Sequence, residues 1–226
     1  MANRPACDCG CANVFSSQEA ENDLKRYLKE GPEASTKALI EALVAEGIEG
    51  ATLLDIGAGI GAIQLELLAA GAAHAESVDA TEAYVATART EAERRGFGDR
   101  VSSRVADFVT VAGEIEPADF VTLDKVVCCY GDMPALLGRA AGRAKRVVGL
   151  VHPRETWWNR LASRLFAVWG WVTRDPTRWH IHPVADIDAV FWNTGFERHD
   201  VKREFIWQIV LYRRRSMPTG VASATA

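Results

Sequence analysis

Hydrophobic positions in the first fifty residues recur at helical spacing. Ser16 and Glu19 form the S-x-x-E pattern of a capping box, which predicts a helix from there to about residue 30, where Gly31 and Pro32 follow. Apolar residues three and four positions apart predict a second helix over residues 35–46, which Gly47 ends.

From residue 51 short apolar runs alternate with segments of helical spacing. Five runs predict strands over residues 51–57, 75–80, 101–108, 118–127 and 146–152. Helices are expected between them, with Thr81 and Asp132 as two of the N-caps. Strands that alternate with helices indicate a doubly wound parallel sheet.

The last third of the chain breaks this rhythm. A helix is predicted over residues 184–194, and two strands over 196–203 and 206–213 with a very short connection, which predicts an antiparallel pair. The fold class is therefore α/β: a Rossmann-like seven-stranded sheet of five parallel strands plus a C-terminal antiparallel hairpin, flanked by helices. The expected segments are a cysteine-bearing tail (1–15), a helical arm (16–50), the main domain (51–215) with a lid-like, tryptophan-rich insert (about 154–183), and a disordered tail (216–226).

Composition narrows the function classes. The chain has 226 residues, 48% of them hydrophobic, and a formal net charge of −4, which suits one domain with a packed core. A weakly acidic protein lacks the basic excess of a dedicated nucleic-acid binder. No apolar run reaches the roughly 20 residues that span a bilayer, and the first residues lack a signal-peptide pattern, so we expect a cytoplasmic protein.

Cysteine and histidine positions offer little for a metal. Cys7, Cys9 and Cys11 stand two residues apart, but a structural zinc site takes four ligands, and a fourth is not evident nearby. His180 and His182 likewise lack an obvious third ligand. We therefore predict no metal site and a mobile N-terminal tail.

The most informative segment is the glycine-rich turn in LLDIGAGIG, residues 53–61, between a predicted strand and a predicted helix. Alternating glycines let a ligand approach the backbone closely. The spacing from Gly57 also fits the NAD fingerprint, with Asp79 placed 22 residues later as a ribose-binding acid. Asp55 argues against NAD, because its carboxylate would face a pyrophosphate of like charge. A ligand with an ammonium and a sulfonium group, such as S-adenosylmethionine, would instead be attracted.

These motifs resemble those of the class I S-adenosylmethionine-dependent methyltransferases, over roughly residues 35–213. The resemblance rests on the glycine-rich turn, the strand-two acid in ESVDA (76–80), the Asp107-Phe108 pair and the terminal hairpin. It implies a methyltransferase with S-adenosylmethionine as cofactor, its ribose held by Asp79 and its adenine by Asp107 and Phe108. The full set of cofactor-binding residues that it implies is Asp55, Gly57, Ala58, Gly59, Gly61, Asp79, Ala80, Asp107, Phe108 and Asp124.

A narrower resemblance concerns LDKVVCCYG (123–131), VHPRETWW (151–158) and DLKRY (23–27). These segments are similar to parts of the magnesium-protoporphyrin O-methyltransferases and their relatives. Cys129 stands where that group has a histidine, and Gly131 replaces its proline.

Methyl transfer mainly requires alignment of the acceptor, and a carboxylate acceptor needs no strong base. Ligands of open α/β sheets bind at the carboxyl ends of the strands. Candidate catalytic residues are therefore Cys129 and Tyr130 after strand four and His152 after strand five, with Tyr27 if the arm folds over the site. Arg154, Trp157 and Trp158 are candidate substrate residues on an aromatic lid.

The tryptophan-rich segment has two other readings, an interfacial helix at a membrane surface and a helix that simply packs on the sheet. We expect a small-molecule methyltransferase, with a carboxylate of a planar aromatic compound as the candidate acceptor. Its partners would include no nucleic acid and no stably inserted membrane. The alternatives are a magnesium-protoporphyrin O-methyltransferase proper, a non-catalytic regulator that binds S-adenosylmethionine, and an NAD-dependent oxidoreductase.

Overall fold

The computed structural model describes residues 16–173 and 179–216 and contains a seven-stranded sheet in the order β3-β2-β1-β4-β5-β7-β6. Strands β1 to β5 pair in parallel, and β7 runs antiparallel to both of its neighbours. The predicted fold class is confirmed. The strands are β1 (Thr52–Ile56), β2 (His74–Asp79), β3 (Val101–Val105), β4 (Ala118–Asp124), β5 (Ala144–Pro153), β6 (Phe196–Arg203) and β7 (Trp207–Arg214).

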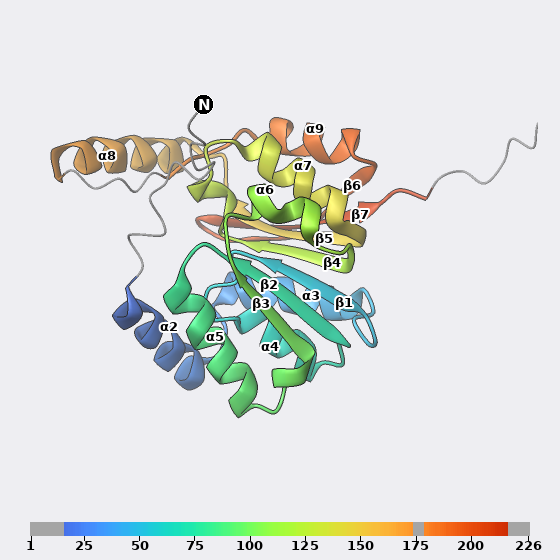
Figure 1. Cartoon of the computed structure of the whole chain (residues 1–226). Helices are drawn as coiled ribbons and strands as arrows, with labels where there is room; N and C mark the ends of the chain where they lie inside the picture. The colour runs from blue at the N-terminus through green and yellow to red at the C-terminus, as the bar shows by residue number, and fades with distance from the viewer. Residues whose placement is uncertain (1–15, 174–178, 217–226) are drawn as a thin grey trace, which may run out of the picture.

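Helices cover both faces of this sheet (Figure 1). One face carries α3, α4 and α5, and the other carries α6, α7 and α9; α2 lies outside α5, and α8 extends away from the sheet. The helices are α2 (Ser17–Glu30), α3 (Ala34–Ala45), α4 (Ala62–Ala69), α5 (Glu82–Arg94), α6 (Phe108–Val111), α7 (Met133–Arg143), α8 (Trp157–Thr173) and α9 (Val184–Asn193). Among the residues described, none of these helices combines the length and apolar character that crossing a membrane requires.

The sheet is buried on both faces, and the alternation of side chains along each strand divides the core in two. In β7, Ile209 and Leu211 pack with α3 and α4, whereas Val210 and Tyr212 pack with α7 and α9. This two-sided burial explains why the strands of the sequence appear as continuous apolar runs.

Two strands end earlier than the sequence predicts. β3 ends at Val105, because Asp107 caps α6: its carboxylate accepts a hydrogen bond from the Val109 amide at 3.0 Å. β4 ends at Asp124, because Lys125 adopts a left-handed φ of +61°, followed by a short 3-10 turn. The chain after each strand is thereby turned across the carboxyl edge of the sheet.

The N-terminal helices differ in their contacts. The capping box before α2 is confirmed, with reciprocal hydrogen bonds between Ser16 and Glu19. α2 packs on α5, whereas α3 packs directly on β5 and β7 and buries Leu39 and Leu43 completely. Of the predicted arm, α3 is therefore part of the core and α2 forms an outer layer.

Close packing of α3 on the sheet requires a glycine in β5. A Cβ at Gly149 would lie 2.7 Å from Leu39 Cδ1, closer than packed carbon atoms approach. We expect Gly149→Ala to lower the free energy of unfolding by about 1–3 kcal/mol through overpacking.

Gly138 in α7 is the matched control, because no described atom lies within 4 Å of a Cβ added there. Gly138→Ala should raise stability by about 0.4–1 kcal/mol. Urea unfolding of both variants measures the two signs, and a loss of stability in both would contradict the explanation.

Candidate active site

The loops at the carboxyl ends of β1, β2 and β4 enclose two adjoining cavities. The larger has a volume of about 340 Å³ and the smaller about 180 Å³. Five residues line both of them: Asp23, Gly57, Gly59, Tyr84 and Asp124. The glycine-rich turn is therefore the wall that the cavities share.

The glycine-rich turn has a conformation that other residues would not fit. Gly57 has a φ of +66°, and a Cβ there would lie 2.4 Å from Val126 Cγ2. Gly59 has a φ of +54°, and its amide donates a 2.9 Å hydrogen bond to Asp79 Oδ2. The other carboxylate oxygen of Asp79 accepts from the Thr81 amide at 2.8 Å. Asp79 thus ties the turn after β1 to the end of β2.

Asp55 is almost completely buried at the end of β1. The Thr122 hydroxyl donates to Asp55 Oδ1 at 2.6 Å, while Oδ2 has no hydrogen-bond partner among the described residues. Burial raises the pKa of Asp55 to about 7, the Thr122 hydrogen bond opposes this rise, and the nearby charges of Asp124 and Asp79 add to it. Asp55 thus keeps its proton to a higher pH than an exposed carboxyl does, and a cation in the smaller cavity that it lines would favour its charged form.

Asp124 ends β4 and faces both cavities. Its Oδ2 accepts a 2.5 Å hydrogen bond from the Thr36 hydroxyl of α3. Its buried Oδ1 has no hydrogen bond within the described chain, and the Lys125 ammonium lies 3.8 Å from it. Burial raises the pKa of Asp124, and Lys125 opposes the rise. Asp55 and Asp124 therefore each present a buried oxygen that accepts no hydrogen bond from the described residues.

The far end of the larger cavity is lined by Asp107, Phe108 and Tyr130. The Tyr130 hydroxyl donates to both carboxylate oxygens of Asp107, at 2.9 and 3.1 Å. Burial, reinforced by this carboxylate, raises the pKa of Tyr130 above its ordinary value. Cys129 also lines this cavity, and a hydrogen bond with the Cys128 thiol lowers the pKa of Cys129. Tyr130 is therefore a proton donor to Asp107 and a poor base.

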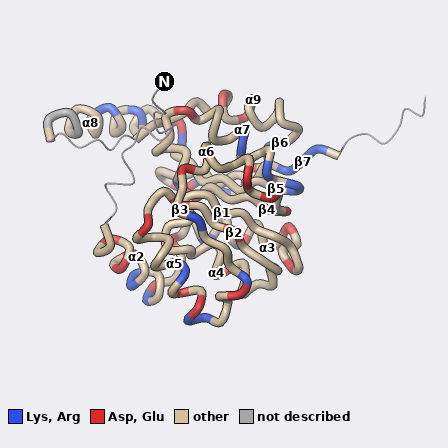
Figure 2. The backbone as a smooth tube through the Cα atoms, in the orientation of Figure 1, with Lys and Arg blue, Asp and Glu red and all other residues tan. Residues whose placement is uncertain are grey.

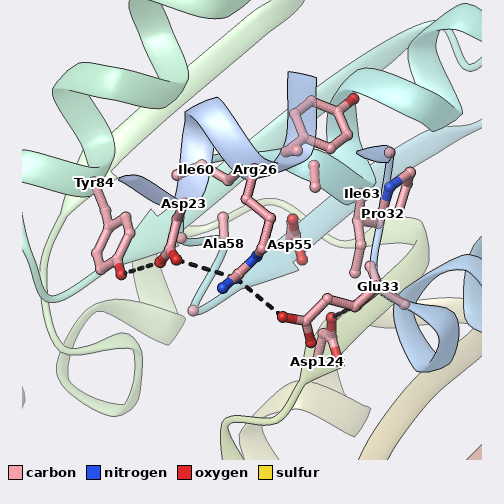
Figure 3. Close-up of a pocket in the computed structure, with 16 residues that line it drawn as sticks. Asp23, Arg26, Pro32, Glu33, Asp55, Ala58, Ile60, Ile63, Tyr84 and Asp124 are labelled. Carbon is pink, nitrogen blue, oxygen red and sulfur yellow. Dashed lines mark hydrogen bonds and ion pairs between the residues drawn. The ribbon is translucent and has the colours of Figure 1, made fainter. Parts of the chain in front are cut away.

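A row of charged and polar side chains lies along the two cavities (Figure 3). Its members come from α2, from α5 and from the turns before α3 and after β4. The Tyr84 hydroxyl donates to Asp23 at 2.7 Å, and the Arg26 guanidinium lies 3.0 Å from both Asp23 and Glu33. Lys125 donates to Glu33 at 2.7 Å and so joins this row to the end of β4. We call these five residues the charged row.

Tyr27, a predicted catalytic residue, lines the smaller cavity but directs its hydroxyl to Glu66 on α4. Burial, together with this carboxylate, raises the pKa of Tyr27. Like Tyr130, Tyr27 is therefore a poor base in this arrangement.

Nine of the ten residues predicted to bind a cofactor line the two cavities. The exception is Gly61, which occupies the N-cap of α4 with a φ of +79°. Sequence reasoning did not predict the charged row, although it singled out residues 23–27 in α2. The partners in the row lie on elements that are far apart in the chain, so no local pattern connects them. The available signal was the i,i+3 spacing of Asp23 and Arg26, which places both on one helix face.

Besides Gly61, four residues predicted as catalytic or substrate-binding lie outside both cavities. His152 is buried in β5, with Nδ1 3.0 Å from the Pro153 carbonyl oxygen, and burial lowers its pKa to about 4. Arg154 donates to the Glu204 carbonyl at 2.9 Å. Trp157 is 72% exposed, and Trp158 stacks on Phe205. The described part of α8 therefore does not line these cavities. Cys7, Cys9 and Cys11 lie outside the described residues.

The sequence and the fold of this chain are similar to those of known proteins. Residues 53–149 match the family model described as a methyltransferase domain. The matched segment runs from β1 into β5 and carries the glycine-rich turn, Asp79, Asp107 and Asp124. The predicted likeness to class I methyltransferases is thus confirmed. Among curated proteins, none matches the sequence.

Solved structures of other proteins share the fold of this chain. Magnesium protoporphyrin IX methyltransferase from Synechocystis PCC 6803, with bound SAH, matches with a TM-score of 0.70 and 19% identity over 91% of this chain and 98% of that chain. An O-methyltransferase family protein from Burkholderia thailandensis matches with a TM-score of 0.72 and 15% identity over 96% and 66% of the two chains. Human N-acetylserotonin methyltransferase, in complex with SAM, matches with a TM-score of 0.65 and 18% identity over 94% and 61%. At these identities the likeness establishes the fold.

The raised pKa of Asp55 makes stability depend on pH. Because the folded protein binds this proton more tightly than the unfolded chain does, the free energy of unfolding falls as pH rises from about 4 to about 7. Asp55→Asn should remove this cost and stabilise the ligand-free protein at pH 8 by about 2–4 kcal/mol, with little effect near pH 4. Urea unfolding at both pH values tests this.

Asp119 is the matched control for Asp55. The Thr52 amide and hydroxyl both donate to it at 2.9 Å, and its pKa is lowered. A lowered pKa contributes stability that is present at pH 8 and lost as pH falls below the unfolded value. Asp119→Asn should therefore destabilise the protein at pH 8. If both variants changed stability in the same direction, the assignment of Asp55 would be wrong.

Proposed function

We propose that this chain is an S-adenosylmethionine-dependent methyltransferase that acts on a small molecule. The observation that carries the proposal is the row of carboxylates, Asp79, Asp55 and Asp124, at the ends of three adjacent strands within a methyltransferase domain. Two of the solved structures with this fold contain bound SAH or SAM.

The charges of the cavity lining fit this cofactor. The described lining holds six acids and two basic residues, Arg26 and Lys125. Asp55 Oδ2 and Asp124 Oδ1, which accept no hydrogen bond from the described residues, are suited to an ammonium and lie where a pyrophosphate would meet like charge. Asp79 would accept the ribose hydroxyls, and Asp107 with Phe108 would hold the adenine. The six acids in the lining are Asp23, Glu33, Asp55, Asp79, Asp107 and Asp124.

The carboxylate of the methionine moiety also requires a partner. Arg26 is the basic residue in the lining of the smaller cavity, which Asp55 also lines, and Figure 3 shows its guanidinium between Asp23 and Glu33. Its two carboxylate partners are on α2 and just before α3, so the side chain can exchange one of them for a ligand without leaving the cavity mouth. We assign Arg26 to the cofactor carboxylate.

When bound, S-adenosylmethionine supplies a methyl group already activated by the sulfonium. The protein's task is then to hold the acceptor in line with that methyl group and to exclude water. Lys125 lines the larger cavity and can pair with an anionic acceptor, and Cys129 lies beside it on the following turn. Residues Gly57 and Gly59 fix the approach of the cofactor to the backbone.

The chemistry of the lining favours an acceptor that needs no base. The hydroxyls of Tyr27 and Tyr130 donate to Glu66 and Asp107, and His152 lies outside the cavities. A carboxylate acceptor is nucleophilic without proton removal, which matches this lack of a free tyrosine or histidine base. We therefore propose a carboxylate of a planar aromatic compound as the acceptor, with magnesium protoporphyrin as one candidate.

Cofactor binding tests the first part of this proposal. Asp79→Ala should weaken S-adenosylmethionine binding by about a hundredfold or more, because two charge-assisted hydrogen bonds of about 1.5–3 kcal/mol each are lost. Isothermal titration calorimetry measures the affinity, with exposed Asp99→Ala as the control. Circular dichroism checks that both variants are folded. Binding of NAD by the wild-type protein would contradict the proposal.

The role of Arg26 predicts a loss confined to one functional group of the cofactor. Arg26→Gln should weaken S-adenosylmethionine binding about tenfold, as expected for one charge-assisted contact at a half-exposed site. Binding of decarboxylated S-adenosylmethionine should not change. Lys29→Gln, at an exposed position of the same helix, is the control. An equal loss for both ligands would show that Arg26 supports the fold of the cavity instead.

The acceptor class is tested with labelled S-adenosylmethionine. The wild-type protein is incubated with a matched panel of planar aromatic carboxylic acids, phenols and amines, and methyl esters are expected. Transfer to amines instead would refute the carboxylate assignment and point to Asp124 as the base. Cofactor binding with no transfer to the panel or to a cell extract would favour the non-catalytic regulator.

A further inference from the structure

Exposed apolar side chains gather on α8 and on the connection between β6 and β7. Among the described residues, six of the twelve exposed large hydrophobic side chains belong to α8, and two more, Phe205 and Ile206, belong to that connection. Trp157 is 72% exposed, Trp169 66% and Leu165 62%. The remaining members on α8 are Leu161, Phe166 and Val168. We call these eight residues the apolar patch.

α8 is fixed to the domain through its first turn. The buried Asn159 amide donates to the carbonyl oxygens of Arg154 and Ile206, at 2.9 and 3.2 Å. Trp158 stacks on Phe205 with the ring centroids 5.8 Å apart. These contacts orient the helix, and beyond them it extends away from the body of the molecule (Figure 1). The exposure of the apolar patch is thus imposed by a specific anchor.

The sequence of α8 is amphipathic. Five apolar residues recur at intervals of three or four positions and therefore share one face of the helix: Trp157, Leu161, Leu165, Val168 and Trp169. Asn159, Arg160 and Ser163 lie outside this arc, and Arg164 lies at its edge, next to Trp157 and Val168. Tryptophan and leucine on one face, flanked by arginine, are typical of helices that lie in a membrane interface.

The charge of α8 has one sign. The helix contains two arginines and no acidic residue, and Figure 2 shows the two basic positions along it. Arg160 pairs with Glu155 before the helix, whereas Arg164 has no ion-pair partner among the described residues. This charge complements anionic lipid headgroups.

We propose that α8 and the β6–β7 connection bind the surface of an anionic membrane. α8 lies in the interface plane, with the apolar patch among the upper acyl chains and Arg164 at the headgroups. The proposal stands on this surface alone and does not depend on the methyl acceptor.

Membrane binding would also act on the candidate site. The His180 amide donates to the Cys128 carbonyl at 2.7 Å, and His182 Nε2 lies 3.1 Å from the Val127 carbonyl and 3.0 Å from that of Tyr130. The chain that follows α8 is therefore bonded to the turn that carries Cys129 and Tyr130. An apolar acceptor dissolved in the bilayer would be presented on the side of the molecule that carries this turn.

Vesicle sedimentation of the full chain tests the proposal. The wild-type protein should bind phosphatidylcholine vesicles that contain phosphatidylglycerol, and bind pure phosphatidylcholine vesicles more weakly. The double variant Leu165→Ser/Trp169→Ser should lower the partition coefficient at least about tenfold, because two apolar side chains no longer enter the interface. Arg164→Gln should lower it about fivefold on anionic vesicles and leave binding to neutral vesicles unchanged.

The matched control is Leu28→Ser/Val105→Ser, which removes two exposed apolar side chains from α2 and β3. It should bind vesicles like the wild type, and thermal unfolding of all variants should be nearly unchanged, because the side chains are exposed. Equal losses in both double variants, or no binding by the wild type, would overturn the proposal. If light scattering instead shows a wild-type dimer that Leu165→Ser/Trp169→Ser converts to a monomer, the patch binds a second copy and the membrane proposal is wrong. Calorimetry on the same samples measures the affinity for S-adenosylmethionine and so tests the proposed function separately.

Discussion

Three carboxylates at the ends of adjacent strands set the main physical constraint on this molecule. Asp79, Asp55 and Asp124 lie at the carboxyl ends of β2, β1 and β4, which are neighbours in the sheet, and burial raises the pKa of each. Like charges in a poorly solvated place repel one another, so the ligand-free protein bears an electrostatic cost there. The cost is reduced by the Gly59 and Thr81 amides and by the Thr122 and Thr36 hydroxyls. A cation in the cavity would reduce it further, and this makes the site selective by charge before any shape is considered.

The rest of the site is arranged around that cost. The glycine-rich turn bends so that a backbone amide faces Asp79, and Lys125 accepts an uncommon left-handed conformation beside Asp124. The charged row then brings α2 and its arginine over the same cavity. The charged row thus adds two basic groups, Arg26 and Lys125, to the acids at the strand ends. That arrangement of charge matches a ligand that is cationic at its centre and anionic at one end.

Sequence reasoning succeeded where the signal is local. The order of strands and helices, the capping box at Ser16 and the carboxyl-edge residues such as Asp79 and Asp107 follow from periodicity and from a motif confined to a few residues. It failed where placement depends on contacts between distant segments. His152 follows the same strand logic as Asp124, but β5 extends to Pro153 and pairs with β7, so the histidine is enclosed within the sheet. The aromatic pattern of α8 showed one apolar face, and the direction of that face depends on the Asn159 anchor to the β6–β7 connection.

The charged row has a consequence for how a ligand enters. Asp23 is shared by Tyr84 and Arg26, and Glu33 is shared by Arg26 and Lys125, so each carboxylate keeps one partner when Arg26 leaves. Withdrawal of Arg26 toward an incoming carboxylate is therefore an exchange of partners, in which one ion pair forms as others are given up. The net free energy of such an exchange is small even when each contact is strong, because the ion pair that forms offsets the contacts that are lost. α2 can thus remain in place while Arg26 changes partners beneath it. The ligand can then enter without unfolding or detachment of the helix.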